Sequence, residues 1–352
     1  MLEYRNVHKR FHLEAGFFAR VGKFVHAVNG VSLRIGENEI YGLVGESGCG
    51  KTTTARLAVR MYPFDAGSIR YTTRDGKTYE IGRLGRRELN CVRTKIKYIF
   101  QDPARSLNPR MTILEVMTAG YRYHPSWPGK RQARGEAARI LEEVGLKASD
   151  LERRPADFSG GQRQRIAIAR ALINRPELLI CDEVVSALDV SIQGQILNLL
   201  LRLREEYRLS MLFIAHDLAV VSYVCDRVGV MYRGLLMEEA SSHELVANPL
   251  HPYTRHLYSS IPKLTGAVAV GAHPAAAGGT LVEAGQPVPT TDEAAAYRAS
   301  VYDAAGAPSH PATRRTKRFG DEPDPTVHPI PIDADPGMRE VSEGHFVSPH
   351  FA

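Results

Sequence analysis

The sequence predicts an α/β protein with a parallel β-sheet core and crossover helices, and two observations support this. The first is a Gly-rich segment at residues 45–52 that reads G-x-x-x-x-G-K-[ST], between a short apolar run and a helix start. The second is a pair of apolar runs at 178–183 and 210–215, separated by a long amphipathic stretch at 191–207. Strand, helix and strand at this spacing are typical of a parallel sheet with crossover helices.

The Gly-rich segment has the pattern of a phosphate-binding loop. It consists of Gly45, Glu46, Ser47, Gly48, Cys49, Gly50, Lys51 and Thr52, followed by Thr53. Glycines allow consecutive backbone N–H groups to curl around phosphate oxygens, and the N-terminus of the following helix adds positive potential. We expect Lys51 to bring its charge to the β- and γ-phosphates, and the Thr52 hydroxyl to ligate Mg²⁺. The strand-loop-helix context disfavours the alternative, a Gly-rich turn before an ordinary helix.

Size and composition are those of a globular protein. At 352 residues, with 43% hydrophobic and 24% charged residues, the chain can form about two structural units with a sizeable core. No apolar run approaches the ~18–20 residues of a membrane-spanning helix, and we expect neither such a helix nor a secretory signal. The net charge of +6 is modest, so we expect no nucleic acid partner. Four scattered cysteines show no metal-ligand or disulfide spacing and favour a reducing cytosol.

The N-terminal third is predicted to be rich in strands. Residues 28–35 alternate apolar and polar side chains before a turn at 36–39. The apolar run 40–44 precedes the phosphate loop, residues 69–81 resemble a hairpin, and 98–103 read as a buried strand ending in a polar loop. An aromatic residue could stack on adenine or pack under a sheet, and the sequence leaves both open. The candidates are Phe11, Phe17, Phe18 and Phe24.

In the middle of the chain, residues 134–144 have apolar positions at helical spacing, which indicates a helix that packs in the core.

Three junctions follow, at each of which polar residues adjoin a predicted helix or strand. A helix predicted at 163–173 is preceded by Ser159, Gly160, Gly161 and Gln162. Free backbone donors at that helix start would form a second anion site. The buried strand 178–183 ends in Asp182 and Glu183, and the next strand ends before His216. Carboxylates at the C-terminal tips of parallel strands are where ligand chemistry occurs.

From about residue 265 the composition changes. Ala, Gly and Pro dominate to about residue 311, and a small basic cluster follows at 314–318. We interpret residues 265–352 as a poorly packed extension of a domain that covers 1–264.

These segments together resemble the ATP-binding cassette (ABC) transporter ATPases. The order identifies the family: phosphate loop, Gln101, Ser159 to Gln162, Asp182 with Glu183, Asp189, then His216. Residues 100–110 and 248–255 further resemble the oligopeptide and dipeptide importers, and 343–347 match faintly. The resemblance implies a P-loop NTPase fold with a RecA-like parallel-sheet core, an antiparallel β subdomain and a helical signature subdomain at about 104–172.

The resemblance also implies a role for each motif residue, with ATP and Mg²⁺ as ligands. Thr52, Gln101 and Asp182 would hold the metal, Asp182 directly or through water. Glu183 would act as general base, and His216 would contact the γ-phosphate. Residues 159–162 would close over the nucleotide of an opposite subunit, and Asp189 would link the two sites.

The implied partners are two transmembrane permease subunits, a second related ATPase subunit that forms a heterodimer, and an extracytoplasmic substrate-binding protein. The implied location is peripheral, at the cytoplasmic face of the inner membrane. The implied cargo is di- or oligopeptides; nickel, glutathione and oligosaccharides are alternatives, because the ATPase never touches cargo.

The chain departs from the family pattern in three places. Val184 stands where relatives commonly have Pro, and no Cys follows Cys225, so we expect no iron–sulfur cluster. The position upstream of Ala27 where relatives usually have an adenine-stacking aromatic falls near Val21 and Gly22. Among non-transport ABC ATPases, DNA-repair proteins insert a long coiled coil where this chain has only residues 102–158, and translation factors usually fuse two cassettes. A module that only binds ATP would lack Glu183.

Overall fold

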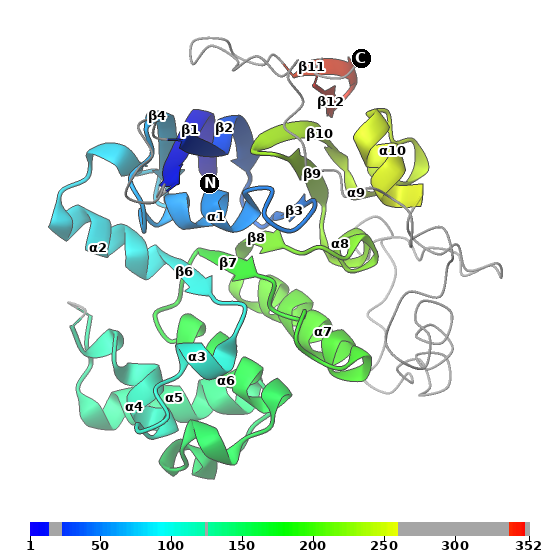
Figure 1. Ribbon diagram of the computed structural model, residues 1–352. Helices are drawn as coiled ribbons and strands as arrows, with labels where there is room; N and C mark the ends of the chain where they lie inside the picture. Colours follow the sequence, from blue (N-terminus) through cyan, green and yellow to red (C-terminus); the bar gives the residue numbers. More distant parts are fainter. Residues whose placement is uncertain (14–22, 124–125, 260–337, 349–352) are drawn as a thin grey trace, which may run out of the picture. The chain divides into compact units, whose positions relative to one another are not determined.

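A computed structural model of the chain describes residues 1–13, 23–123, 126–259 and 338–348. The chain divides into two compact units, one of residues 1–255 with 336–352 and the other of residues 256–335. Of the second unit, only residues 256–259 are described. Most of the helices and strands are labelled in Figure 1.

The larger sheet of this unit is mostly parallel. Its strand order is β11-β12-β10-β9-β3-β8-β7-β6, and the pairs from β9 to β6 are parallel. These strands are β3 (Ile40–Val44), β6 (Ile96–Ile99), β7 (Leu178–Asp182), β8 (Ser210–Ile214), β9 (Arg227–Tyr232), β10 (Leu235–Ser241), β11 (Arg339–Ser342) and β12 (His345–Val347). Every residue of β3, β7 and β8 is buried, as continuous apolar runs in a parallel sheet predict. The predicted parallel core is confirmed.

A second, antiparallel sheet packs against this core. Its order is β2-β1-β4-β5, from β1 (Leu2–Leu13), β2 (Lys23–Ile35), β4 (Ala66–Thr72) and β5 (Thr78–Glu80). The hydrophobic core between the sheets includes Leu2, Tyr4, Val31, Leu57 and Tyr71. The predicted hairpin at 69–81 is therefore present as β4 and β5.

Helix α1 (Lys51–Ala58) is the next element after β3 and lies between the two sheets (Figure 1). The phosphate loop that joins them therefore lies at the C-terminal edge of the parallel strands. The other helices, listed with the short 3₁₀ turns, are α2 (Arg86–Lys95), α3 (Pro103–Ser106), α4 (Ile113–Thr118), α5 (Lys130–Glu143), α6 (Gly160–Leu172), α7 (Val190–Tyr207), α8 (Leu218–Val224), α9 (Ser242–Ala247), α10 (Pro252–Ser259), η1 (Ile81–Arg83), η2 (Tyr121–Tyr123), η3 (Ala148–Glu152) and η4 (Pro155–Asp157). Helices α3 to α6 form the predicted helical group, which packs on itself below β6 and β7 in Figure 1.

The C-terminal end of the predicted extension lies in the main sheet. Strands β11 and β12 form a hairpin whose second strand pairs with β10, Glu238 opposite Val347 and Glu239 opposite Phe346. Residues 338–348 therefore belong to the first unit, although the domain boundary predicted at residue 264 assigns them to the extension. The composition after residue 265 contains no signal that residues 338–348 pair with the main sheet. The boundary itself lies outside the described residues and stays a prediction.

Deletion of residues 338–352 is expected to destabilise the first unit. The His345 imidazole is 1% exposed and lies 2.7 Å from Oε1 of Glu238, which is itself fully buried. Removing the hairpin would leave that carboxylate without its imidazole partner, at a cost of about 1–3 kcal/mol. Urea unfolding of the deletion variant beside the full chain would measure the difference. An unchanged free energy of unfolding would show that the hairpin contributes nothing to the fold.

Candidate functional site

The phosphate loop is shaped by glycines that no other residue could replace. Gly45 has φ +144 and Gly50 has φ +112, the left-handed half of backbone space that favours glycine. A Cβ atom on Gly45 would lie 2.0 Å from the backbone oxygen of Met231, and one on Gly50 would lie 2.0 Å from that of Ala27. Around Gly48, with φ +82, a Cβ would meet nothing within 4 Å, so the loop faces open space there. The loop is thus closed on its protein side and accessible on the other.

Lys51 lies inside this loop. Its side chain is buried, and Nζ donates to the backbone oxygens of Gly45, at 2.6 Å, and of Glu46, at 2.8 Å. No side chain caps the N-terminus of α1, so the first N–H groups of that helix are available to an anion. The Cys49 thiol lies 3.7 Å from Nζ of Lys51. Burial raises the pKa of this thiol, so it stays neutral beside the ammonium. Positive potential is therefore concentrated at the mouth of the loop.

Thr52 and Asp182 come together from α1 and β7. The Thr52 hydroxyl donates to Oδ1 of Asp182 at 2.9 Å, and the Tyr98 hydroxyl donates to Oδ2 at 2.6 Å. Hydroxyl and carboxylate oxygens are the ligands that Mg²⁺ prefers, so these residues fit the metal that the family implies. Gln101, predicted as a third ligand, donates its amide nitrogen to Oε2 of Glu183 at 2.6 Å, and its role toward the metal stays a prediction.

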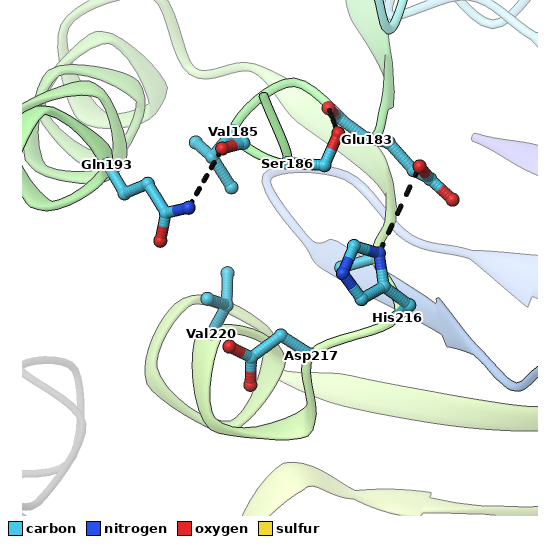
Figure 2. A pocket seen from close by; sticks show the side chains of 8 residues that line it. Glu183, Val185, Ser186, Gln193, His216, Asp217 and Val220 are labelled. Atoms are coloured by element: carbon cyan, nitrogen blue, oxygen red, sulfur yellow. Dashed lines mark hydrogen bonds and ion pairs between the residues drawn. The ribbon is translucent and has the colours of Figure 1, made fainter. Parts of the chain in front are cut away.

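Glu183 is the centre of the second half of the site. It has φ +50, a left-handed conformation that is uncommon for a non-glycine residue, and its amide donates to the oxygen of Ile214 at 3.0 Å. This geometry holds the side chain next to His216, whose Nδ1 lies 3.9 Å from Oε2 of Glu183 (Figure 2). A cleft of about 50 Å³ adjoins the pair. It is lined by Glu183, Val185, Ser186, Gln193, Ala215, His216, Asp217 and Val220.

Residues 159–162 begin α6. The Ser159 hydroxyl accepts from the amide of Gln162, at 3.3 Å, and the Gln162 side chain accepts from the amide of Ser159, at 3.0 Å. This capping box orients the helix start. A Cβ on Gly161 would lie 2.6 Å from Cγ2 of Ile192, so this glycine also permits close packing of α6 against α7.

The helix start at α6 is exposed and does not face the phosphate loop of its own chain. Ser159, Gly160 and Gln162 are exposed, and Figure 1 shows α6 in the helical group, separated from α1 by β6 and β7. Asp189 is also exposed, at the N-cap of α7. The structure therefore brings Lys51, Thr52, Asp182 and Glu183 to one edge of the sheet. Residues 159–162 lie in the helical group, where Gly160 lines a cavity with Gln101 and Val184.

The structure adds residues that the motifs do not reveal. Tyr98 contacts Asp182 because β6 pairs with β7, with Tyr98 opposite Ile180. The Tyr253 hydroxyl accepts from the amide of Glu46 at 3.2 Å. Strand order could have indicated Tyr98. Tyr253 lies in the segment 248–255 that resembles the importers, but nothing in that segment indicates its contact with Glu46.

Two of the four aromatic candidates for adenine stacking have described neighbours. Phe11 packs edge-on against Tyr62, with ring centroids 5.4 Å apart, and Phe24, 47% exposed, lies 4.2 Å from the ring of His12. Phe17 and Phe18 lie outside the described residues. The described contacts favour none of the four for adenine.

A phosphate loop, two acids at a strand tip and a helical subdomain with an exposed Ser-Gly-Gly-Gln helix start define an ATP-binding cassette ATPase. Comparisons with known proteins agree. The sequence matches the ABC transporter family over residues 28–186 and the oligopeptide/dipeptide transporter C-terminal region over residues 237–278. The structure is similar to a dimeric ATP-binding cassette solved in a post-hydrolysis state with ADP and Pi. The TM-score is 0.58 at 28% identity, covering 69% of this chain and 99% of the other.

Relatives place the chain more narrowly. It is 48% identical over 263 residues to the oligopeptide transport ATP-binding protein AppF of Bacillus subtilis. The matched residues are 74% of this chain and 78% of AppF. It is 47% identical over 269 residues to the oligopeptide transport ATP-binding protein OppF of Escherichia coli, at 74% and 78% coverage. The chain therefore belongs to the oligopeptide/dipeptide group of ABC transporter ATP-binding proteins.

Substitution of Tyr98 by Phe is expected to weaken metal-dependent ATP binding. The variant loses the hydrogen bond that holds Oδ2 of Asp182, so the carboxylate is less well oriented toward Thr52. We expect the Mg²⁺ concentration for half-maximal ATPase activity to rise about two- to tenfold, the effect of one hydrogen bond. A magnesium titration measures this, with Tyr123→Phe, an exposed tyrosine, as the matched control. Equal titration curves for Tyr98→Phe and the wild type would exclude this role.

Proposed function

We propose that this chain is the ATP-hydrolysing subunit of an importer for di- and oligopeptides, and that it works through separate permease subunits. The observation that carries the cargo class is the match of both the cassette and residues 237–278 to oligopeptide transport proteins, at 47–48% identity. The glutathione import ATP-binding protein GsiA of Shigella flexneri is 45% identical, but the chain covers only 41% of it, so peptide is the better-supported cargo.

The reaction is hydrolysis of the β–γ phosphoanhydride. Backbone N–H groups from Gly48 to Thr52, with the Lys51 ammonium, bind and orient the phosphates. Thr52 and Asp182 would hold Mg²⁺, which would neutralise phosphate charge. The amide oxygen of Gln101 would be the third ligand, since Gln101 donates to Glu183 through its amide nitrogen. Ser47 and Thr53 are the residues immediately before and after those whose backbone N–H groups bind the phosphates.

Glu183 moves the proton. Its carboxylate accepts a proton from the attacking water as the water oxygen bonds to the γ-phosphorus and the bond to the bridging oxygen breaks, which releases ADP and phosphate. His216 lies beside this carboxylate, where it can donate a hydrogen bond to the γ-phosphate. Gln101, bonded to Oε2, keeps the carboxylate from rotating away.

The exposed helix start at α6 serves a second cassette. The capping box uses the amides of Ser159 and Gln162 and leaves out those of Gly160 and Gly161. The backbone N–H groups of these two glycines, on a helix start where Ser159, Gly160 and Gln162 are exposed, suit the nucleotide of a partner ATPase subunit that packs on this face. Asp189, exposed at the start of α7, suits a contact between the two sites. ATP would then be bound between two related chains, and hydrolysis would remove the contacts that favour the closed dimer.

The membrane partners are inferred from the relatives of this chain. Relatives of this chain are named as ATP-binding proteins of oligopeptide transport, and on that basis we assign the pore to separate permease subunits. We place the chain on the cytoplasmic face of the inner membrane, with the loop after Gln101 as the docking surface and an extracytoplasmic protein that delivers the peptide. None of the helices in the described part of the chain has the length and apolar character needed to span a bilayer.

Co-purification from native membranes followed by reconstitution tests the proposal. We expect two permease chains and a second ATPase to co-purify, and ATP hydrolysis to rise on addition of peptide with its binding protein. Stimulation by glutathione, nickel or an oligosaccharide, but not by peptides, would overturn the peptide assignment. Purification of the chain without any membrane protein would overturn the importer role.

A further inference from the structure

A tyrosine far along the chain contacts the phosphate loop. The Tyr253 hydroxyl accepts from the backbone N–H of Glu46 at 3.2 Å, and its ring lies 4.4 Å from that of Tyr232. The turn after Tyr232 is bonded to the same loop, because the amide of Gly234 donates to the oxygen of Cys49 at 2.8 Å. The outer side of the phosphate loop is therefore supported by the β9–β10 turn and by Tyr253.

The segment that carries Tyr253 is fixed by a buried carboxylate. Glu238 is 0% exposed, on β10, and accepts from the amides of Leu250, at 2.8 Å, and His251, at 3.0 Å. The His251 ring nitrogen Nδ1 in turn accepts from the amide of Tyr253 at 3.1 Å. A buried carboxylate is costly unless its oxygens are fully hydrogen-bonded, so Glu238 constrains where this segment can lie.

The third partner of Glu238 comes from the C-terminal hairpin. His345 Nε2 lies 2.7 Å from Oε1 of Glu238, and since a carboxylate only accepts, the ring donates. Strand β12 holds His345 there through its pairing with β10, and the amide of Ser348 donates to the oxygen of Met237 at 2.8 Å. One carboxylate thus joins the hairpin to the segment 250–253 (β10, β12 and α10 in Figure 1).

We propose that Tyr253 is a positioning residue for the phosphate loop, and that the C-terminal hairpin sets its place through Glu238. Tyr253 bonds to the second residue of the loop, whose neighbour Gly45 supplies one of the two oxygens that hold Lys51. The hydrogen bond restricts the loop to the shape that accepts phosphates, so ATP affinity depends on residues 338–348. The inference rests on the assignment of this loop to ATP.

The first test is Tyr253→Phe, which keeps the ring on Tyr232 and removes the hydroxyl. We expect the Kd for a non-hydrolysable ATP analogue to rise about two- to tenfold, with kcat at saturating ATP unchanged within about twofold. Tyr223→Phe, which removes a tyrosine hydroxyl bonded to Asn198 on α7, is the matched control. A wild-type chain that does not bind the analogue would refute the ATP assignment. A wild-type Kd for Tyr253→Phe would refute the inference alone.

The second test addresses the hairpin. His345→Leu removes the donor to Glu238, and His345→Gln keeps an N–H that can reach it. We expect the leucine variant to raise Kd as much as Tyr253→Phe and the glutamine variant to restore much of the affinity. Ile140→Val, a buried change in α5, controls for general loss of stability and should leave Kd unchanged.

A double-mutant cycle decides whether the two residues act as one unit. If the hairpin acts through Tyr253, His345→Leu has no further effect on Kd when Tyr253→Phe is already present. Additive effects of the two substitutions would show that the hairpin acts by another route and would overturn this part of the inference.

Discussion

Replacement of Glu183 by Gln is expected to preserve ATP binding and to lower hydrolysis by about 10²–10⁴, the usual scale for a lost general base. The amide has the same shape and can still bond to Gln101, but it cannot take a proton from water. The hydrogen bond from Gln101 to Oε2 orients the side chain at this position. His216 lies 3.9 Å away and contacts the carboxylate rather than substituting for it.

Steady-state phosphate release by the reconstituted transporter measures this effect, together with an ATP titration of the same variant. Asp217→Asn is the matched control: Asp217 lines the same cleft and caps α8 by accepting from the amide of Ala219 at 2.8 Å, a role that Asn also fills. Hydrolysis within about threefold of wild type is expected for the control, since Asn caps helices as well as Asp. Equal rates for Glu183→Gln and the wild type would remove Glu183 from the base role.

Lys51→Ala is expected to have the largest effect on ATP affinity. The ammonium is buried in the loop, already bonded to two backbone oxygens, so its charge is fixed where the β- and γ-phosphates arrive. Hydrogen bonds to charged groups contribute about 1.5–3 kcal/mol, which corresponds to a loss of about ten- to 150-fold in affinity.

Isothermal titration with MgATP tests this, with Lys77→Ala as control because Lys77 is an exposed lysine outside the loop. Circular dichroism of both variants ensures that the loss is not unfolding. Retention of the wild-type Kd by Lys51→Ala would mean that nucleotide binds elsewhere.

The parts of the site that sequence could predict are those that depend on local backbone. The glycines at 45 and 50 are required by left-handed φ values and close backbone neighbours, which a motif records directly. Asp182 and Glu183 follow from a buried strand that ends in acids. The parallel order of the strands then brings these loops to one edge of the sheet without any further signal.

The parts that sequence could not predict depend on contacts between distant segments. Tyr253 reaches Glu46 across the loop, and His345 reaches Glu238 after a long segment of low-complexity composition. Their neighbours in sequence carry no periodicity that indicates such contacts. The hydrogen bond from Gln101 to Glu183 likewise depends on side-chain rotation, which a motif does not encode.

The central claim is that residues 159–162 act on the nucleotide of a second cassette, and Gly160→Asp tests it most directly. Gly160 has no positive φ, a Cβ there would only touch Leu188 at 3.7 Å, and an acid is favourable at a helix N-terminus, so the isolated chain should fold normally. We expect a wild-type Kd for ATP in the isolated variant, with hydrolysis lost at the composite site of the assembled transporter, because the new carboxylate repels the partner's phosphates. A loss of ATP affinity in the isolated chain as large as that of Lys51→Ala would contradict the claim.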